Sequence, residues 1–156
     1  MQRRVFLATA LAAAWPRAAS AQAQGLALRP IEPENALERA FVAALDNEAM
    51  RPVFRRLLVE APLALALASN AAEAQPLQRP LRDGAVAGLI FTSAARLDSV
   101  LGPDAPRAVL PGRDALERLR GHYAVLNFSL APMLTLEPDD IERYLDIPES
   151  SAGPTQ

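Results

Sequence analysis

Prolines and glycines interrupt this sequence so often that they leave room only for short helices and short strands. The chain contains 14 Pro and 7 Gly among 156 residues, and both residue types end or bend regular elements. The apolar residues between these interruptions follow two periods. Residues 37–45 repeat every three to four positions, as in a helix, whereas residues 63–68 alternate with a period of two, as in a strand.

Capping residues place the starts of two helices. Asn35 is followed three residues later by Glu38, the spacing of a capping box, and Ser93 precedes another apolar helical pattern. The predicted helices cover residues 35–46, 47–61, 93–101, 113–120 and 138–145, the predicted strands cover residues 63–68, 85–91, 107–110, 123–128 and 133–136, and residues 69–82 are a loop. This order predicts an α+β domain with a single mixed sheet of about four to five short strands and helices packed mainly on one face.

The first 21 residues predict an export signal. The basic pair Arg3-Arg4 precedes the uncharged run Val5–Trp15, and Ala19-Ser20-Ala21 has the small residues that a signal peptidase requires. The apolar run spans about 16 Å as a helix, short of the ~30 Å hydrocarbon core, so we expect no stable membrane insertion after cleavage. Arg-Arg-x-Phe-Leu favours twin-arginine export, and a general secretory signal is the alternative. We therefore expect a periplasmic or secreted protein.

The rest of the chain divides into a leader, one domain and a tail. Residues 22–33 contain Gly25, Pro30 and Pro33 without a sustained period, which predicts a flexible leader. Residues 34–148 hold all the predicted helices and strands, and a domain of this size folds without disulfides or metal. Residues 149–156 are predicted to be a disordered tail.

Charge and rare residue types exclude several functions. With no Cys and a single His, the chain has no thiolate chemistry, no disulfides and no zinc site built from several Cys or His ligands. Beyond residue 21, 13 Arg stand against 18 acidic residues and are interspersed with them, which argues against nucleic-acid binding. The sequence also has no glycine-rich phosphate loop and no H-E-x-x-H motif, so we expect no cofactor.

Two groups of residues suggest chemistry but have simpler explanations. His122 precedes Ser129 by seven residues, and this odd spacing places a base and its nucleophile on opposite faces of a strand. Four acids near the C-terminus offer oxygen ligands for a hard cation: Glu137, Asp139, Asp140 and Glu142. Pro138 marks a helix start there, and acids in a first turn interact favourably with the helix dipole. We expect neither catalysis nor metal binding from these groups.

The turn between residues 91 and 94 is the main candidate ligand site. The hydroxyls of Thr92 and Ser93, the free N–H groups of a helix start and the nearby Arg96 are suited to a carboxylate or phosphate. The simpler alternative is that Ser93 only caps the helix. Asn127 and Ser129 form a second candidate ligand or interface pair, with a turn at the end of a strand as the alternative.

Four short motifs then occur in a distinctive order. They are N-A-L-E at 35–38, I-F-T-S with a following R-L pair at 90–97, V-L-N with Ser129 at 125–129, and L-E-P-D-D-I at 136–141. In this order they resemble the N-terminal domain of the SseB family, the proteins named for enhanced serine sensitivity, although Phe128 stands where that family usually has Pro. The resemblance implies the same fold and an interaction role, and it implies no catalytic activity.

We therefore expect an exported, non-enzymatic domain that binds an unknown protein partner. The alternative is a small-ligand or anion-binding module that uses Thr92, Ser93 and Arg96. The identity of the partner, the oligomeric state and the process served stay open at this point.

Overall fold

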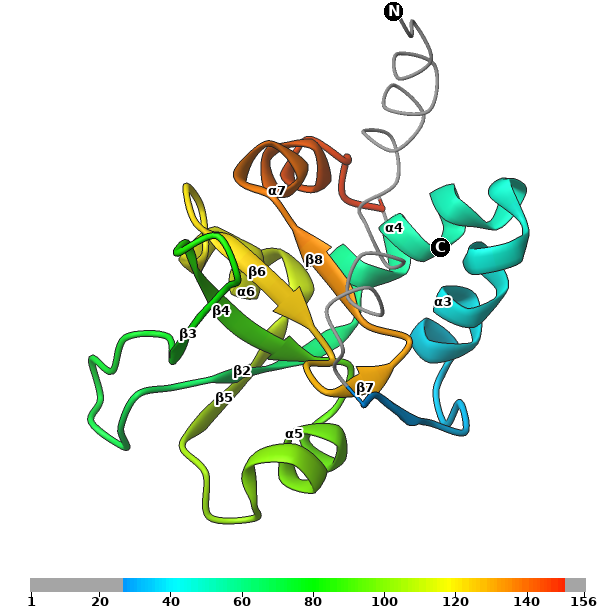
Figure 1. The fold of residues 1–156 in the computed structure, drawn as a ribbon. Coiled ribbons are helices and arrows are strands. Elements are labelled where there is room, and N and C mark those ends of the chain that lie inside the picture. The colour runs from blue at the N-terminus through cyan, green and yellow to red at the C-terminus, as the bar shows by residue number, and fades with distance from the viewer. Residues whose placement is uncertain (1–26, 151–156) are drawn as a thin grey trace, which may run out of the picture.

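The computed structural model describes residues 27–150, so the predicted export signal (1–21) and residues 151–156 of the predicted tail lie outside it. A mixed sheet forms the centre of the domain (Figure 1). Its six strands are β2 (Pro62–Ala66), β3 (Gln78–Pro80), β4 (Val86–Phe91), β5 (Arg107–Pro111), β6 (Tyr123–Leu126) and β8 (Leu134–Leu136). The α+β class is confirmed, with six strands in place of the four to five expected.

The strands are ordered β5-β2-β4-β6-β8, and β4 and β6 form the parallel pair at the centre. All the other pairings in this sheet are antiparallel. Strand β3 pairs with the first half of β4, whereas β2 pairs with its end. The carboxyl ends of β4 and β6 therefore lie next to each other, and the segments that follow both strands leave the sheet at one edge.

Alternating side chains give the sheet two apolar faces. Leu63 and Leu65 of β2 enter one core, whereas Ala64 and Ala66 enter the other. Ile90 belongs to the first core and its neighbours on β4 to the second. The period of two in residues 63–68 is thus that of a strand buried on both faces.

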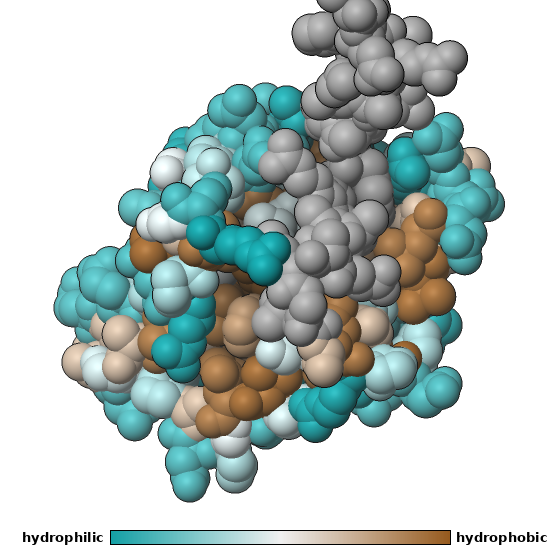
Figure 2. Space-filling view, viewed as in Figure 1, coloured by the Kyte–Doolittle hydropathy of each residue, from teal (hydrophilic) through white to brown (hydrophobic). Residues whose placement is uncertain are grey.

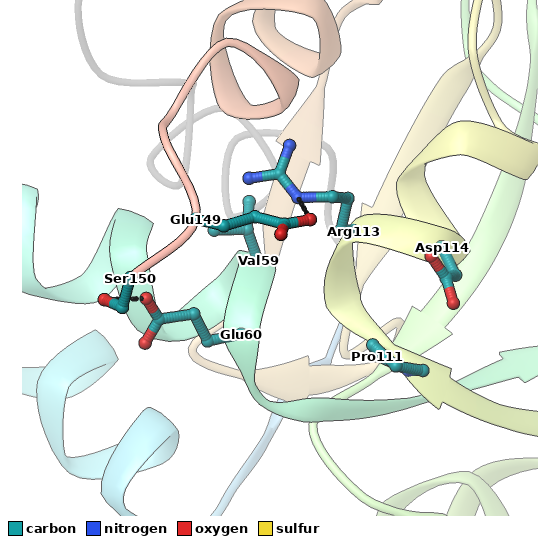
Figure 3. A pocket seen from close by; sticks show the side chains of 7 residues that line it. All are labelled: Val59, Glu60, Pro111, Arg113, Asp114, Glu149 and Ser150. Carbon is teal, nitrogen blue, oxygen red and sulfur yellow. Dashed lines mark hydrogen bonds and ion pairs between the residues drawn. The ribbon is translucent and has the colours of Figure 1, made fainter. Parts of the chain in front are cut away.

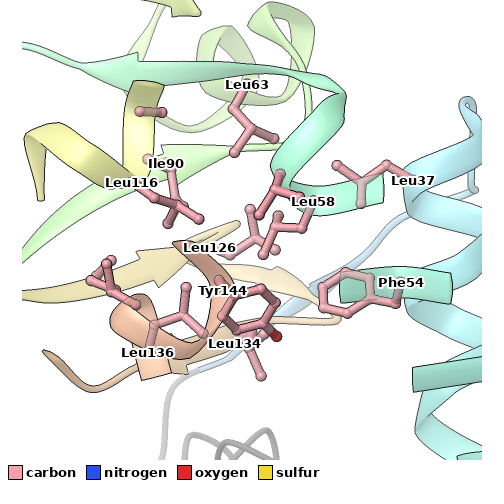
Figure 4. Close-up of a cluster of buried hydrophobic side chains, with 14 of the residues drawn as sticks. Leu37, Phe54, Leu58, Leu63, Ile90, Leu116, Leu126, Leu134, Leu136 and Tyr144 are labelled. Atoms are coloured by element: carbon pink, nitrogen blue, oxygen red, sulfur yellow. The ribbon is translucent and has the colours of Figure 1, made fainter. Parts of the chain in front are cut away.

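Four helices cover the first face of the sheet: α3 (Ala36–Asp46), α4 (Arg51–Glu60), α6 (Gly112–Arg118) and α7 (Pro138–Leu145). Their side chains fill a core with those of the strands (Figure 4). The rings of Phe41 on α3 and Phe54 on α4 stack there, with centroids 4.7 Å apart. This face holds most of the helices, as predicted.

The second face has a thinner cover. It is formed by α5 (Ala94–Leu101), through the buried Leu97, and by a small two-stranded sheet of β1 (Arg29–Pro30) and β7 (Leu130–Ala131). Leu28 and Ile31, on either side of β1, pack against the same core.

Two segments expected to be irregular form strands instead. Strand β3 lies within the predicted loop 69–82, and β1 lies within the predicted flexible leader 22–33. Strand β1 runs parallel to β7, with main-chain bonds of 3.1 Å from Arg29 N to Ser129 O and from Ile31 N to Ala131 O. Both strands are short and carry Pro, so pairing defines them and local pattern does not: β3 forms a hairpin with the β4 strand that follows it, and β1 pairs with β7, which is distant in sequence.

The predicted helix starts are confirmed at atomic level. The Asn35 side chain accepts from Glu38 N at 2.8 Å and caps α3, and Ser93 caps α5 by accepting from Arg96 N at 3.2 Å. Asn47 caps a short 3₁₀ turn, η1 (Glu48–Met50), which leads into α4. Within residues 27–150, none of these helices has the length and apolar character needed to cross a membrane.

Helix α6 begins at a position where the chain passes directly against α4. A Cβ atom built on Gly112 would lie 1.7 Å from the carbonyl oxygen of Leu58 and 2.8 Å from its carbonyl carbon. Main-chain atoms in a helix cannot move aside as a flexible side chain does. Only glycine allows β5, α6 and α4 to meet at this distance.

Candidate functional site: a buried polar network around Glu38

Polar side chains follow both central parallel strands at the point where each strand ends. Thr92 comes directly after β4 and Asn127 directly after β6. Both residues are buried, with relative exposures of 3% and 0%. In open sheets with parallel strands, ligands bind at this carboxyl edge, so these residues occupy the position of a candidate site.

The carboxylate of Glu38 occupies the centre of this position. Glu38 lies on the first turn of α3 and is 1% exposed. Its Oε1 accepts from the Thr92 hydroxyl at 2.6 Å and from Arg96 Nε at 2.9 Å, and its Oε2 accepts from an Arg96 terminal nitrogen at 3.0 Å and from Glu34 N at 2.7 Å. Four hydrogen bonds therefore satisfy a charge that would be costly to bury alone.

Arg96 also fastens the segment that leads into α3. Its guanidinium donates to the main-chain carbonyl of Glu32 and lies 3.5 Å from a carboxylate oxygen of Glu34. The Asn35 amide adds a bond of 3.3 Å to the main-chain oxygen of Thr92. The network thus ties the start of α3 to the β4–α5 turn.

Asn127 completes the network from β6. Its Oδ1 accepts from Thr92 N at 3.0 Å, and its own N–H donates to Ile90 O at 2.9 Å. Asn127 and Ser129 both have positive φ, 57° and 65°, and the bond from Leu130 N to Asn127 O closes a turn there. Asn tolerates this left-handed conformation better than most residues, which explains its use in this turn.

Electrostatics keep Glu38 ionised. Burial by itself raises the pKa of Glu38, but hydrogen bonds from Arg96, Glu34 N–H and the Thr92 hydroxyl outweigh burial and lower that pKa to about 2. The bond to Glu38 in turn raises the pKa of the Arg96 guanidinium. The two side chains form a permanent ion pair at neutral pH.

Comparison with known proteins identifies the family of this chain. The family model described as the SseB protein N-terminal domain matches residues 36–143. The chain belongs to the SseB N-terminal domain family. No curated protein and no solved structure gives a significant match. The resemblance inferred from the four sequence motifs is confirmed by this family match.

In this SseB domain, the residues predicted to bind an anion have partners within the chain. Thr92 and Arg96 both bind the Glu38 carboxylate, and the Ser93 hydroxyl caps α5. A carboxylate does occupy the predicted position, but it belongs to the protein. An outside anion would have to displace Glu38, which is held by four bonds.

The second predicted pair contributes differently to the SseB domain. Asn127 joins the network through its side chain, whereas Ser129 contributes a main-chain oxygen that accepts from Arg29 N. Glu38 is the central residue that sequence reasoning interpreted only as part of a capping box. Its side chain accepts from Glu34 N and not from the N-cap residue. The R-L pair of the family motif was the one signal that Arg96 has a fixed role.

His122 and Ser129 lie at opposite ends of β6 in the SseB domain. His122 is exposed just before β6 and Ser129 lies beyond its other end, so the full strand separates them. The acidic residues near α7 have structural roles. Asp140 accepts from Glu137 N at 3.0 Å and pairs with Arg143 at 2.8 Å, and Glu142 pairs with Arg120 at 3.2 Å. Among residues 27–150, no group of acids converges on a metal position.

A shallow pocket of about 310 Å³ lies on the SseB domain between α4, the start of α6 and the chain after α7 (Figure 3). It is lined by Val59, Glu60, Pro111, Arg113, Asp114, Glu149 and Ser150. Arg113 donates to Leu145 O at 2.7 Å and to Ile147 O, and it lies 3.5 Å from Glu149. Ser150 donates to Glu60 at 2.6 Å. These bonds hold the C-terminal segment to the domain, which gives the pocket walls a structural role.

Proposed function

We propose that this SseB domain is an exported, non-catalytic protein that acts by binding an extended segment of another protein. The observation that carries the proposal is the open edge of β5. In the sheet formed by residues 27–150, β5 has a neighbouring strand on one side only, which is β2. Every residue of β5 is at least partly exposed, and Val109 is 57% exposed.

The register determines which main-chain groups of β5 face away from the sheet. Residues of an antiparallel pair that exchange hydrogen bonds alternate with residues whose N–H and C=O point outward. Two bonds bracket the β2–β5 pair: Leu67 N to Pro106 O at 2.9 Å and Gly112 N to Ala61 O at 2.8 Å. Between them, Ala108 and Leu110 therefore face β2. Arg107, Val109 and Pro111 face outward.

The outward main-chain groups of β5 can form hydrogen bonds with the main chain of an added strand. Val109 offers one N–H donor and one C=O acceptor to an added strand, and Arg107 offers a second such pair. Pro111 has no N–H, so it limits the edge to a short pairing and protects it from uncontrolled aggregation. A short extended peptide with an apolar residue beside Val109 fits this surface.

The network around Glu38 supports the non-catalytic part of the proposal. Most of the polar groups at the carboxyl edge of β4 and β6 are bonded to one another, although the buried Asn127 Nδ2 has no hydrogen-bond partner within residues 27–150. An active site needs such groups directed at a substrate. The same bonding favours protein binding over the alternative small-ligand module at Thr92, Ser93 and Arg96.

The binding proposal is tested with two substitutions at one position. Val109→Pro removes only an outward N–H, whereas Val109→Thr keeps that donor and the branched shape. Each variant is used to retain proteins from the exported fraction of the producing cells. We expect a specific protein to bind the wild type and Val109→Thr and to be lost with Val109→Pro at unchanged melting temperature. Equal retention by all three forms would overturn β5 as the binding edge.

Export is tested by the intact mass and the fractionation of the native protein. We expect a mature form that lacks about 21 residues in the periplasm or medium, because the peptidase cleaves after Ala21. A variant with Arg3→Lys and Arg4→Lys separates the two routes, because loss of export in this variant supports the twin-arginine route. An uncleaved cytoplasmic protein would contradict export.

A further inference from the structure

The outer face of α3 carries a symmetric pattern of residues. Arg39, Val42, Ala43 and Asp46 are spaced i, i+3, i+4 and i+7, so they share one face of the helix. The opposite face, with Phe41 and Ala44, fills the core. Val42 is 36% exposed, which is unusual beside so many buried apolar residues. Figure 2 shows apolar surface over α3 at the right of the view.

The charges at the two ends of this face have no strong partner within residues 27–150. Arg39 only donates to the main-chain oxygen of Glu34, at 3.4 Å and in an exposed position. No ion pair involving Asp46 forms in this part of the chain, and Asp46 is exposed. Arg39 and Asp46 thus flank a small apolar centre formed by Val42 and Ala43. When a second such helix runs antiparallel to the first, its acid lies opposite the base and its base opposite the acid.

We propose that two copies of this chain associate through an antiparallel contact between their α3 helices. Arg39 of each copy then faces Asp46 of the other, and Val42 of each faces Ala43 of the other. Both ion pairs form together because seven residues span about 10 Å on either helix at ~1.5 Å per residue. A two-fold contact of this kind is isologous, so one patch serves both copies.

The pattern fits a second copy better than an unrelated protein. The four positions are related by a two-fold axis midway between Val42 and Ala43, which an unrelated partner does not require. Small residues at the centre allow two helices to approach closely. Leu45 on the same helix is 38% exposed, and Val53 on the adjacent α4 is 44% exposed, so both extend the apolar area beside the contact. This surface is separate from β5, so the inference goes beyond the proposed function.

The test measures mass by sedimentation equilibrium across a range of protein concentrations, with protein purified from cells that express the full sequence. We expect the wild-type mass to rise toward twice that of the chain and to rise less at high salt, which screens exposed ion pairs. Arg39→Glu places a second acid against Asp46 of the other copy, and Asp46→Arg places a second cation against Arg39. Each variant alone is expected to associate at least about tenfold more weakly, because facing like charges repel.

A mixture of the two single variants gives the decisive result. One copy then carries two acids and the other two arginines, so we expect the mixture to form a dimer when neither variant does alone. Arg118→Glu on α6 is the matched control for Arg39→Glu, because it makes the same change in net charge at another exposed position. This control should leave association unchanged. A wild-type chain that stays monomeric at every concentration would overturn the inference. So would association that is equal in the single variants and the wild type.

Discussion

Glu38 and Arg96 are 58 residues apart in sequence and meet in a two-point ion pair, with distances of 2.9 Å from Nε to Oε1 and 3.0 Å from a terminal nitrogen to Oε2. The Glu38 side chain is fully buried and that of Arg96 is 13% exposed. The pair joins the first helix to the turn at the end of the central strand.

Replacing Glu38 by Gln should destabilise the fold strongly. The substitution removes the buried counter-ion of Arg96 and leaves only the exposed carboxylate of Glu34 beside its guanidinium. Breaking a buried pair in this way costs about 3–5 kcal/mol. Urea unfolding of both forms measures the difference. Glu117→Gln is the control, since its pair with Arg120 is about half exposed and is worth under about 1 kcal/mol. Similar losses in both variants would contradict the buried pair as the stronger element.

The stabilising effect of Glu38 should depend on pH in the acid range. Its pKa is about 2 in the folded chain against an ordinary 4.5, so the unfolded chain takes up this proton first as the pH falls. The contribution, on the order of 3 kcal/mol, is present above about pH 5 and is lost between pH 4.5 and 2.

Comparison with Glu38→Gln isolates this effect from other carboxylates. The stability gap between wild type and variant should narrow by about 2 kcal/mol between pH 7 and pH 3. Denaturant titrations at both pH values measure the gap. A gap that stays constant would mean that Glu38 titrates normally in the folded chain.

Gly112→Ala should destabilise the domain more than Gly88→Ala. The new Cβ at residue 112 meets the Leu58 carbonyl oxygen at 1.7 Å, whereas at residue 88 it meets a methyl group of Leu119 at 2.3 Å. A leucine side chain rotates away, but the main chain of α4 does not. We expect a loss of about 3 kcal/mol or more at Gly112 and of about 1–3 kcal/mol at Gly88. Thermal unfolding ranks the two, and the reverse order would show that α4 yields more easily than the Leu119 side chain.

Asn127→Ala should cost about 2–4 kcal/mol. The substitution removes the acceptor of the buried Thr92 N–H. It also puts Ala, whose side chain cannot form hydrogen bonds, in the left-handed conformation at φ 57° that Asn tolerates better. Ser129→Ala is the matched control, because Ser129 has a similar φ of 65° and its side chain lies outside the network. Chemical denaturation compares both variants with the wild type. Equal losses would assign the effect to backbone conformation alone.

Local sequence patterns predicted most of the elements and missed the contacts between them. Asn35 caps α3 as its spacing indicates, because capping involves only neighbouring residues. The same spacing suggested that Glu38 bonds back to the cap. In the structure its carboxylate reaches Arg96 and Thr92 instead. Only the tertiary fold brings those partners within reach.

The shortest strands were missed for a related reason. Strands β1 and β3 have two and three residues and contain Pro30 and Pro80, which favour irregular structure in local sequence patterns. Strand β3 forms because the longer β4 offers free main-chain groups, and β1 forms because it pairs with β7, which is equally short but distant in sequence. The candidate site was located by Thr92, Arg96 and Asn127, but its nature as an internal ion-pair network depended on Glu38 and was not predictable from spacing.

The position of α7 has a consequence for when the chain can fold. Ile141 and Tyr144 from this last helix lie in the same core as Leu37 and Phe41 from the first. During synthesis, part of the apolar face of the early helices stays exposed until the last helix has emerged from the ribosome. The domain therefore completes its core only after translation has passed Leu145, and a nascent chain of any shorter length remains open to chaperones and proteases.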